Sequence, residues 1–152
     1  MVKKYYPYSD FVRDVKELAY QIGDTRFDAI IAVARGGMTL AHFLAEHLGI
    51  RTIHTINARS YEDTEKLAYV QLGHLPDISC YERVLLVDDI IDSGDTVRAI
   101  LEKLEDPKDG TIAVATLFYK PSAVIEPDYY VHVADAWIDF FWTRDMHDFD
   151  DR

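Results

Sequence analysis

The chain has 152 residues, of which 49% are hydrophobic and 28% charged, the balance of one compact globular domain. Its net charge of −11 leaves no basic footprint for nucleic acid, so DNA and RNA are not expected partners. The single cysteine, Cys80, excludes an internal disulfide, which suits the cytosol. No apolar run approaches the length of a membrane span, and the first ten residues lack the hydrophobic stretch of a signal peptide, so we expect a cytoplasmic protein.

The first part of the chain alternates between helical and strand patterns. Hydrophobic residues of the first segment fall on one helical face, with Ser9 or Asp10 as the expected cap and Gly23 after its end. A β-branched run then ends in Arg-Gly-Gly, and a second helical pattern meets Gly49. The expected elements are a helix within 8–22, a buried strand within 27–37, a helix at 38–48 and a strand at 51–58.

The second part of the chain begins with a polar segment, 59–77, whose weak periodicity predicts a long loop. Alternating strands and helices follow, and the tail is aromatic and then acidic. The expected elements are strands at 83–87, 110–119 and 129–134 and a helix at 96–106. This alternation predicts an α/β fold, a single domain over residues 1–152 with a mostly parallel, twisted sheet of about five strands flanked by helices.

Ligands of such sheets bind beyond the carboxyl ends of the strands, where the sequence places its least ordinary residues. The stretch RVLLVDDIIDSGDT, residues 83–96, can be interpreted in three ways. Its acids can be a solvated strand end followed by a helix cap. They can form the Asp-Asp-x-x-Asp pattern of prenyl-diphosphate enzymes, but that pattern lies on a helix, whereas these acids follow a β-type run. They can also hold a sugar phosphate.

In the third interpretation, backbone N–H groups at the start of a helix bind the phosphate. Ser93 and Thr96 add hydroxyl donors, and Gly94 supplies backbone freedom. Asp88 and Asp89 bind ribose hydroxyls or hydrated Mg²⁺, which prefers oxygen ligands. Together these groups would hold a ribose 5-phosphate.

The stretch VLLVDDIIDSGDT resembles the phosphoribosyl diphosphate signature of type I phosphoribosyltransferases. This resemblance implies a diphosphate loop at Arg35, Gly36 and Gly37, with a non-proline cis peptide between Ala34 and Arg35. It implies a purine site in which Lys120 contacts the 6-oxo group, Trp137 stacks on the base and the backbone of Ile138 reads its edge. It also implies a mobile lid at about 59–73, beginning at Ser60 and Tyr61, and a C-terminal hood at about 135–152.

Together with VARGG, FYKPS and W-I-D-x-x-W, the signature is most similar to the bacterial xanthine–guanine phosphoribosyltransferases. The implied reaction moves the 5-phosphoribosyl group from phosphoribosyl diphosphate to N9 of guanine, xanthine or hypoxanthine, as in purine salvage. Asp92 is the candidate base, Arg35 stabilises the departing diphosphate, and Mg²⁺ is held by Asp88 and Asp89. We also expect a homodimer or homotetramer.

Four residues depart from the expected pattern. Asp95 puts a carboxylate inside a phosphate loop, so its side chain either points outward or weakens phosphate binding. Asp139 stands where close relatives tend to carry a glutamate, and Phe140-Phe141 makes the hood more apolar. The aromatic stretch that includes Trp142 also fits a core cluster or a subunit interface. Two other functions remain open: a regulator that binds phosphoribosyl diphosphate without catalysis, and a transferase for another base.

Overall fold

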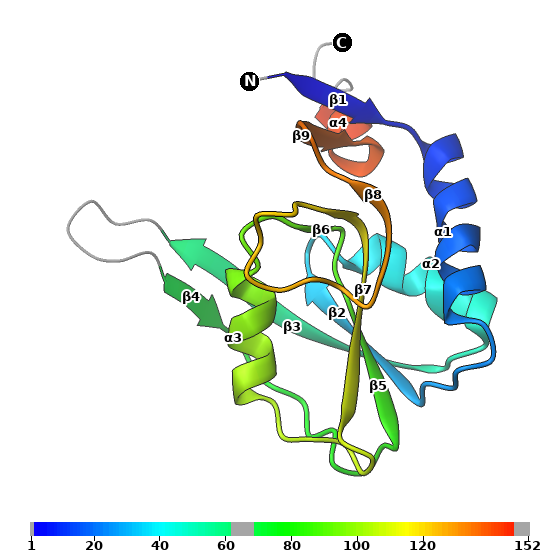
Figure 1. Ribbon diagram of the computed structural model, residues 1–152, viewed down its shortest axis with the longest axis vertical. Helices are drawn as coiled ribbons and strands as arrows, with labels where there is room; N and C mark the ends of the chain where they lie inside the picture. Colours follow the sequence, from blue (N-terminus) through cyan, green and yellow to red (C-terminus); the bar gives the residue numbers. More distant parts are fainter. Residues whose placement is uncertain (1, 62–68, 148–152) are drawn as a thin grey trace.

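The structure is a computed structural model that describes residues 2–61 and 69–147 (Figure 1). The chain order of its elements is as follows: β1 (Lys3–Tyr6), α1 (Tyr8–Ile22), β2 (Ala29–Ala34), α2 (Met38–Leu48), β3 (Thr52–Tyr61), β4 (Tyr69–Leu72), β5 (Arg83–Val87), β6 (Ile90–Ile91), α3 (Asp95–Lys103), β7 (Thr111–Tyr119), β8 (Tyr129–Val133), β9 (Trp137–Phe140) and α4 (Phe141–His147). The predicted alternation of strands and helices is confirmed, and the expected cis peptide lies between Ala34 and Arg35.

The main sheet has seven strands, and its path runs β4-β3-β2-β5-β7-β6, with β8 paired to β7. The five predicted strands, β3, β2, β5, β7 and β8, pair in parallel, as crossovers through helices require. The additional two are the short β6, which pairs in parallel with the end of β7, and β4, which pairs antiparallel with β3. The carboxyl ends of β2, β5 and β7 therefore meet at one edge of the sheet.

Each face of the sheet has its own core, because the buried strands place apolar side chains on both faces. Helices α1 and α2 cover one face, where Phe11 and Leu44 pack against Leu85 of β5. Helix α3 covers the other face, where Val97 and Ile100 belong to a second cluster. Figure 1 shows α3 on the opposite side of the sheet from α1 and α2.

The C-terminal hood is built from both ends of the described chain. Strand β1 pairs in parallel with β9, with Tyr6 opposite Phe140, and α4 follows directly. Figure 1 places β1, β9 and α4 together above the carboxyl edge of the main sheet. The Tyr6 ring meets Phe118 and Phe140 edge to face, with centroids 5.1 and 5.7 Å away. The aromatic tail is thus a packed cluster, as one of the two interpretations of this stretch predicted.

The same Tyr6 ties the hood to the core through a buried hydrogen bond. Its hydroxyl donates to Oδ2 of Asp14 on α1 over 2.6 Å, and Nε2 of His132 on β8 lies 2.7 Å from the same oxygen. Burial and the bond to Asp14 raise the pKa of Tyr6 far above its usual value. The phenol therefore stays protonated and remains a donor to the buried carboxylate.

Two local predictions are wrong. Segment 59–77 is not one long loop: β3 continues through Tyr61, and β4 returns beside it with Ala58 opposite Leu72. Neither Ser9 nor Asp10 caps α1, because the helix begins at Tyr8 and Pro7 is the capping residue. Proline has no N–H and a fixed φ, so it suits a helix start without a side-chain cap. Of the lid predicted at about 59–73, residues 62–68 lie outside the described residues.

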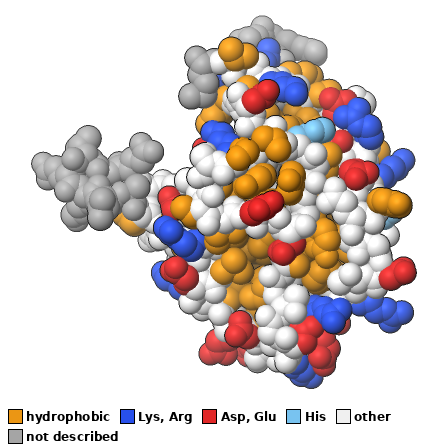
Figure 2. Space-filling model, in the orientation of Figure 1, with side chains coloured by type: hydrophobic (Ala, Val, Ile, Leu, Met, Phe, Trp, Pro, Cys, Tyr) orange, Lys and Arg blue, Asp and Glu red, His pale blue; other side chains and the backbone are white. Residues whose placement is uncertain are grey.

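The surface charge and the helix lengths concern two sequence predictions, that the protein has no nucleic-acid partner and no membrane span. On the face shown in Figure 2, basic side chains are scattered among acidic ones around a central group of hydrophobic side chains. In the ranges 2–61 and 69–147, no helix has the length and apolar character needed to cross a bilayer. Cys80 is exposed rather than buried, in the connection that leads to β5.

Candidate functional site

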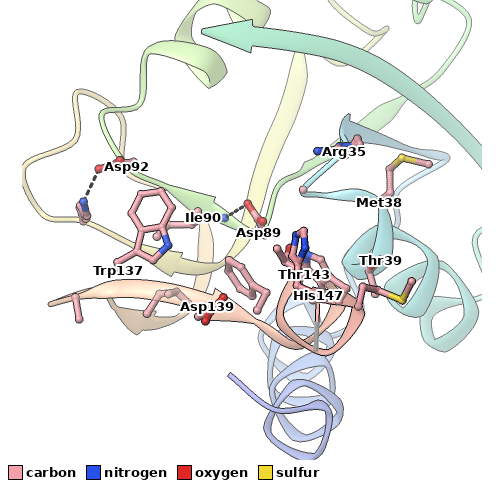
Figure 3. Close-up of a pocket in the computed structure, with 17 residues that line it drawn as sticks. Arg35, Met38, Thr39, Asp89, Ile90, Asp92, Trp137, Asp139, Thr143 and His147 are labelled. Atoms are coloured by element: carbon pink, nitrogen blue, oxygen red, sulfur yellow. Dashed lines mark hydrogen bonds and ion pairs between the residues drawn. The ribbon is translucent and has the colours of Figure 1, made fainter. Parts of the chain in front are cut away.

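Two cavities meet at the carboxyl edge of the sheet. The first, which we call the hood cavity, has a volume of about 720 Å³ and is lined by Arg35, Asp89, Lys120 and Trp137. The second, which we call the loop cavity, has a volume of about 800 Å³ and lies beside the start of α3 and the β3–β4 pair. Ile90 and Asp92 line both cavities. Figure 3 shows the hood cavity with Asp92 and Trp137 at one end, Arg35 and Met38 at the other, and Asp89 between them.

Asp88 and Asp89 follow β5 directly but serve different cavities. Asp88 lines the loop cavity, whereas Asp89 lines the hood cavity. Local hydrogen bonds fix both side chains: Oδ1 of Asp88 accepts from the N–H of Asp89 over 2.8 Å, and Oδ1 of Asp89 accepts from Ile90 over 2.7 Å. A strand end therefore delivers two neighbouring acids, whose side chains interact with each other while each lines a different cavity.

Both carboxyl groups have a raised pKa. Burial is the main cause in each case, and for Asp88 the neighbouring charge of Asp89 adds to it. A bound cation would offset this cost by stabilising the ionised forms. Across the described segments, no group of three or more His, Cys, Asp or Glu side chains is arranged to hold a metal ion. Two adjacent carboxyl groups fit an ion such as Mg²⁺, which uses one or two carboxylates and takes its other oxygens from a phosphate substrate and water.

The loop between β2 and α2 approaches these acids so closely that two of its positions have no room for a side chain. A Cβ on Gly36 would lie 2.6 Å from Oδ2 of Asp89. A Cβ on Gly37 would collide with the carbonyl oxygen of Val87 and lie 2.9 Å from Cα of Asp88. Gly37 lies beneath the acids, while Arg35 and Gly36 line the hood cavity. The pair of glycines is therefore a packing requirement as well as a turn.

The turn from β6 into α3 wraps the loop cavity. Gly94 has a φ of 86°, a left-handed conformation that favours glycine, and a Cβ there would press against Ile125 at 3.0 Å. The carbonyl of Ser93 accepts a 2.9 Å hydrogen bond from the N–H of Val124, so a second loop braces this turn. Ser93, Gly94 and Thr96 all line the cavity, as expected for these residues.

Asp95 is the first residue of α3, and its carboxylate turns along the helix. Its Oδ1 accepts from Arg98 over 2.9 Å, and its Oδ2 accepts from the hydroxyl of Ser93 over 3.0 Å. The ion pair with Arg98 reduces the negative charge that this carboxylate presents to the turn. The position is compatible with an anion in the loop cavity.

The purine-site candidates also come together. Lys120 follows β7, and its Nζ lies 2.6 Å from Oδ1 of Asp92. Trp137 is the first residue of β9 and is 51% exposed, with its ring standing in the hood cavity (Figure 3). Ile138 beside it is buried and lines the same cavity. Asp139 stands where a glutamate was expected. Its Oδ2 accepts a 2.9 Å hydrogen bond from the guanidinium of Arg144 on α4, so it has a partner within the hood.

Sequence reasoning missed several residues of the site. Met38 and Thr39 at the start of α2 line the hood cavity, as do Thr143, Met146 and His147 of α4. The residues of α4 reach the cavity only through the docking of the hood, and Met38 and Thr39 belong to an ordinary helical pattern, so neither group gave a strong signal. Ser60 and Tyr61 line the loop cavity, where the rings of Tyr61 and Tyr69 stack with centroids 5.2 Å apart. Residues 62–68 of the predicted lid are outside the described part of the chain.

The sequence matches the phosphoribosyl transferase domain family over residues 1–148. It is 34% identical over 133 residues to the xanthine-guanine phosphoribosyltransferase of Chromohalobacter salexigens. The aligned region covers 86% of this chain and 77% of that protein. It is 32% identical over 141 residues to the enzyme of the same name from Idiomarina loihiensis, with 89% and 83% coverage.

A solved structure with a similar fold is the xanthine-guanine-hypoxanthine phosphoribosyltransferase of Helicobacter pylori, with a TM-score of 0.89 and 35% identity. That similarity covers 99% of this chain and 100% of the other. A purine phosphoribosyltransferase from Pyrococcus horikoshii has a TM-score of 0.80 at 32% identity, with 93% and 95% coverage.

Proposed function

The chain belongs to the phosphoribosyltransferase family, and from that premise we propose that it transfers the 5-phosphoribosyl group of phosphoribosyl diphosphate to N9 of a 6-oxopurine. The products are the nucleoside monophosphate and diphosphate, as in purine salvage. The protein is a phosphoribosyltransferase enzyme most similar to the xanthine–guanine type. We propose guanine, xanthine and hypoxanthine as the candidate acceptor bases.

One observation carries this proposal: Asp92 lines both cavities. The loop cavity has the features of a sugar phosphate site, and the hood cavity has those of an aromatic base site. A bond between base and sugar must form where the two sites meet, and Asp92 is exposed at that junction. A group there can act on the base and the ribose within one reaction.

The sugar phosphate occupies the loop cavity. The backbone N–H groups of the turn at Ser93 to Thr96, with the two hydroxyls, bind the 5-phosphate. The first turn of α3 adds the favourable end of the helix dipole. Asp88, on the same side, accepts hydrogen bonds from the ribose hydroxyls.

The purine occupies the hood cavity. The indole of Trp137 stacks on the base, and the ammonium of Lys120 donates to its 6-oxo oxygen. A donor at this place favours an oxo group over the amino group of adenine. The backbone of Ile138 contacts the opposite edge of the base, where guanine and xanthine differ from hypoxanthine.

The diphosphate lies against the β2–α2 loop, where Arg35 and Gly36 line the hood cavity and offer a charged side chain and accessible backbone. Gly37, the other residue predicted to bind the diphosphate, is instead buried, and its N–H donates to the carbonyl of Val33 over 2.8 Å. Asp89, with Asp88, would hold Mg²⁺, which when bound supplies positive charge to the departing diphosphate. The two carboxylates would hold that ion in position, while the guanidinium of Arg35 binds the diphosphate leaving group directly.

In the proposed step, N9 of the purine forms a bond to C1′ of the ribose as the bond from C1′ to the diphosphate oxygen breaks. The electron pair of that broken bond leaves with the diphosphate, so the transition state carries positive charge on the ribose. The proton on N7 passes to the carboxylate of Asp92, at the junction of the two cavities.

The test is an assay of the purified protein with Mg²⁺, phosphoribosyl diphosphate and each of guanine, xanthine, hypoxanthine, adenine and uracil. Nucleotide formation is followed by chromatography. The proposal expects nucleotide from one or more 6-oxopurines and far less from the other two bases. Turnover of adenine or uracil alone would overturn the base assignment, and tight binding without any turnover would identify a regulator. We also propose a homodimer or homotetramer, which light scattering of the same sample would measure.

A further inference from the structure

The hydroxyl of Thr116 is an unusual group in this molecule. Thr116 is 0% exposed, and within residues 2–61 and 69–147 its Oγ1 is the one buried side-chain polar atom without a hydrogen-bond partner. Buried polar groups nearly always have a partner, because an unmade hydrogen bond costs free energy. A hydroxyl held in this way near a functional site invites a functional explanation.

The strand register places Thr116 beside Asp88. Val87 pairs with Ala115 and Ile90 pairs with Phe118, and the same offset puts Asp88 opposite Thr116. The N–H of Asp88 donates to the carbonyl of Ala115 over 3.2 Å, which completes the Val87–Ala115 pair and holds Asp88 against β7. Asp88, directly after β5, and Thr116 of β7 are therefore lateral neighbours.

Both side chains point to the same face of the sheet. Strand side chains alternate between faces, and Leu86 of β5 and Val114 of β7 both belong to the core cluster under α3. Two residues further along the chain in each case, Asp88, just past the end of β5, and Thr116 of β7 follow on that face. Asp88 reaches the loop cavity from there, whereas Thr116 remains covered. Directly opposite residues of adjacent strands lie close enough for their side chains to interact.

The carboxyl group of Asp88 is held locally: its Oδ1 accepts from the N–H of Asp89, and it also interacts with the side chain of Asp89. A carboxylate has about four acceptor sites, so it can take a second donor without losing the first. A hydroxyl is suited to this role because it rotates freely and its hydrogen can turn toward a neighbour when that neighbour moves.

We propose that Thr116 is a positioning residue, whose hydroxyl donates to the carboxylate of Asp88 when the sugar diphosphate is bound. The inference rests on the proposed function and deepens it by adding a residue behind the ribose site. The free protein keeps the hydroxyl unpaired, and the bound state pairs it. Thr116 thus lowers the stability of the free protein and increases its affinity for phosphoribosyl diphosphate.

The experiment compares Thr116→Val, which keeps the shape and removes the hydroxyl, with Thr116→Ser, which keeps the hydroxyl. Thermal unfolding of the free proteins and calorimetric titration with phosphoribosyl diphosphate and Mg²⁺ are the two measurements. For Thr116→Val we expect the unfolding midpoint to rise by about 2–4 °C, because an unpaired buried hydroxyl is lost. We expect its Kd for phosphoribosyl diphosphate to increase about tenfold, because a hydrogen bond to a charged group is lost.

Thr116→Ser should bind like the wild type, since it retains the donor. Thr55→Val, on the exposed edge of β3, is the matched control, and neither of its measurements should change. A merely structural threonine would not move stability and affinity in opposite directions. An unfolding midpoint that falls in Thr116→Val would show that the hydroxyl already has a partner in the free protein, which would overturn the inference.

The two proposals fail in different ways. If the wild type binds phosphoribosyl diphosphate and Thr116→Val binds it equally well, the role of Thr116 is wrong while the proposed function stands. If the wild type itself does not bind phosphoribosyl diphosphate in the presence of Mg²⁺, the proposed function is wrong and the inference falls with it.

Discussion

The ammonium of Lys120 lies 2.6 Å from Oδ1 of Asp92, so the proposed purine-binding donor and the proposed base hold each other in the free protein. The side chain of Lys120 is 33% exposed and that of Asp92 is 60% exposed. Such a partly exposed pair contributes little to stability. It keeps both groups at the junction of the two cavities, and an entering purine can draw the lysine to its 6-oxo oxygen and leave the carboxylate free to accept a proton.

Asp92→Asn should lower kcat by about 10²–10⁴-fold, because the amide cannot take the N7 proton. The Kd for phosphoribosyl diphosphate should stay close to the wild-type value, since the phosphate turn and the ribose acids are unchanged. Steady-state kinetics and calorimetric titration measure the two quantities. Asp24→Asn, at an exposed position before β2, is the control. An Asp92→Asn enzyme with full turnover would remove this residue from the role of base.

Lys120→Ala should raise the KM for the 6-oxopurine about tenfold or more, because a charge-assisted hydrogen bond to the base is lost. The KM for phosphoribosyl diphosphate should change much less. Lys108→Ala removes a lysine whose Nζ lies 3.9 Å from Glu82, remote from both cavities, and serves as the control for loss of one positive charge. Equal losses of affinity for both substrates would mean that Lys120 supports the site structurally rather than by reading the base.

Gly36→Ala should weaken phosphoribosyl diphosphate binding more than it changes stability. The added methyl group would meet the side chain of Asp89 at 2.6 Å, and that side chain must turn away from its hydrogen bond with Ile90. Gly73→Ala places its Cβ 3.2 Å from Asn57 and tests the general effect of replacing a glycine. Titration with phosphoribosyl diphosphate and Mg²⁺ gives the affinities, and an unchanged affinity in Gly36→Ala would refute the close approach of loop and acid.

Asp88→Asn should stabilise the free protein at neutral pH while weakening substrate binding. Burial raises the pKa of Asp88 in the folded state, so the folded protein binds that proton more tightly than the unfolded chain does. Its contribution to stability is therefore present at low pH and is lost as pH rises above the ordinary pKa of an aspartate toward the raised one. The advantage of Asp88→Asn should grow over that interval in urea unfolding curves and disappear in acid.

Asp77 provides the control of opposite sign. Hydrogen bonds from Ser79 lower its pKa, so its ionised form favours the folded state above the ordinary aspartate pKa. Asp77→Asn should not stabilise the protein at neutral pH. If Asp88→Asn and Asp77→Asn shift stability in the same direction, the buried carboxyl of Asp88 does not carry the cost assigned to it.

Local patterns predicted most of the main sheet and its helices. The apolar face of α1 has a strict helical period, and β2, β5 and β7 are buried on both sides, so their sequences are continuous apolar runs. The four-residue β4 was missed because it is a short, partly exposed partner of β3 with polar neighbours. Propensity carries little information for such an edge strand.

The site likewise contains residues that are contiguous in sequence and residues that only the packing of distant elements brings together. The turn from Ser93 to Thr96 and the acids before it are contiguous in sequence, so their placement at a strand end could be predicted. Thr116 was missed because a threonine inside a β-branched run is an ordinary strand former. His147 and Thr143 were missed because the docking of α4 places them at the cavity.

The parallel pairing of β1 with β9 makes the first residues of the chain a structural part of the wall that holds Trp137, whose N–H donates to the carbonyl of Val2 over 3.2 Å. Affinity tags for purification are commonly fused at that end. A tag that pulls Lys3 out of register would therefore change base affinity while leaving the sugar phosphate turn at the start of α3, which does not pair with β1 or β9, as it was. A tag-free preparation is the appropriate reference for every kinetic comparison made with this enzyme.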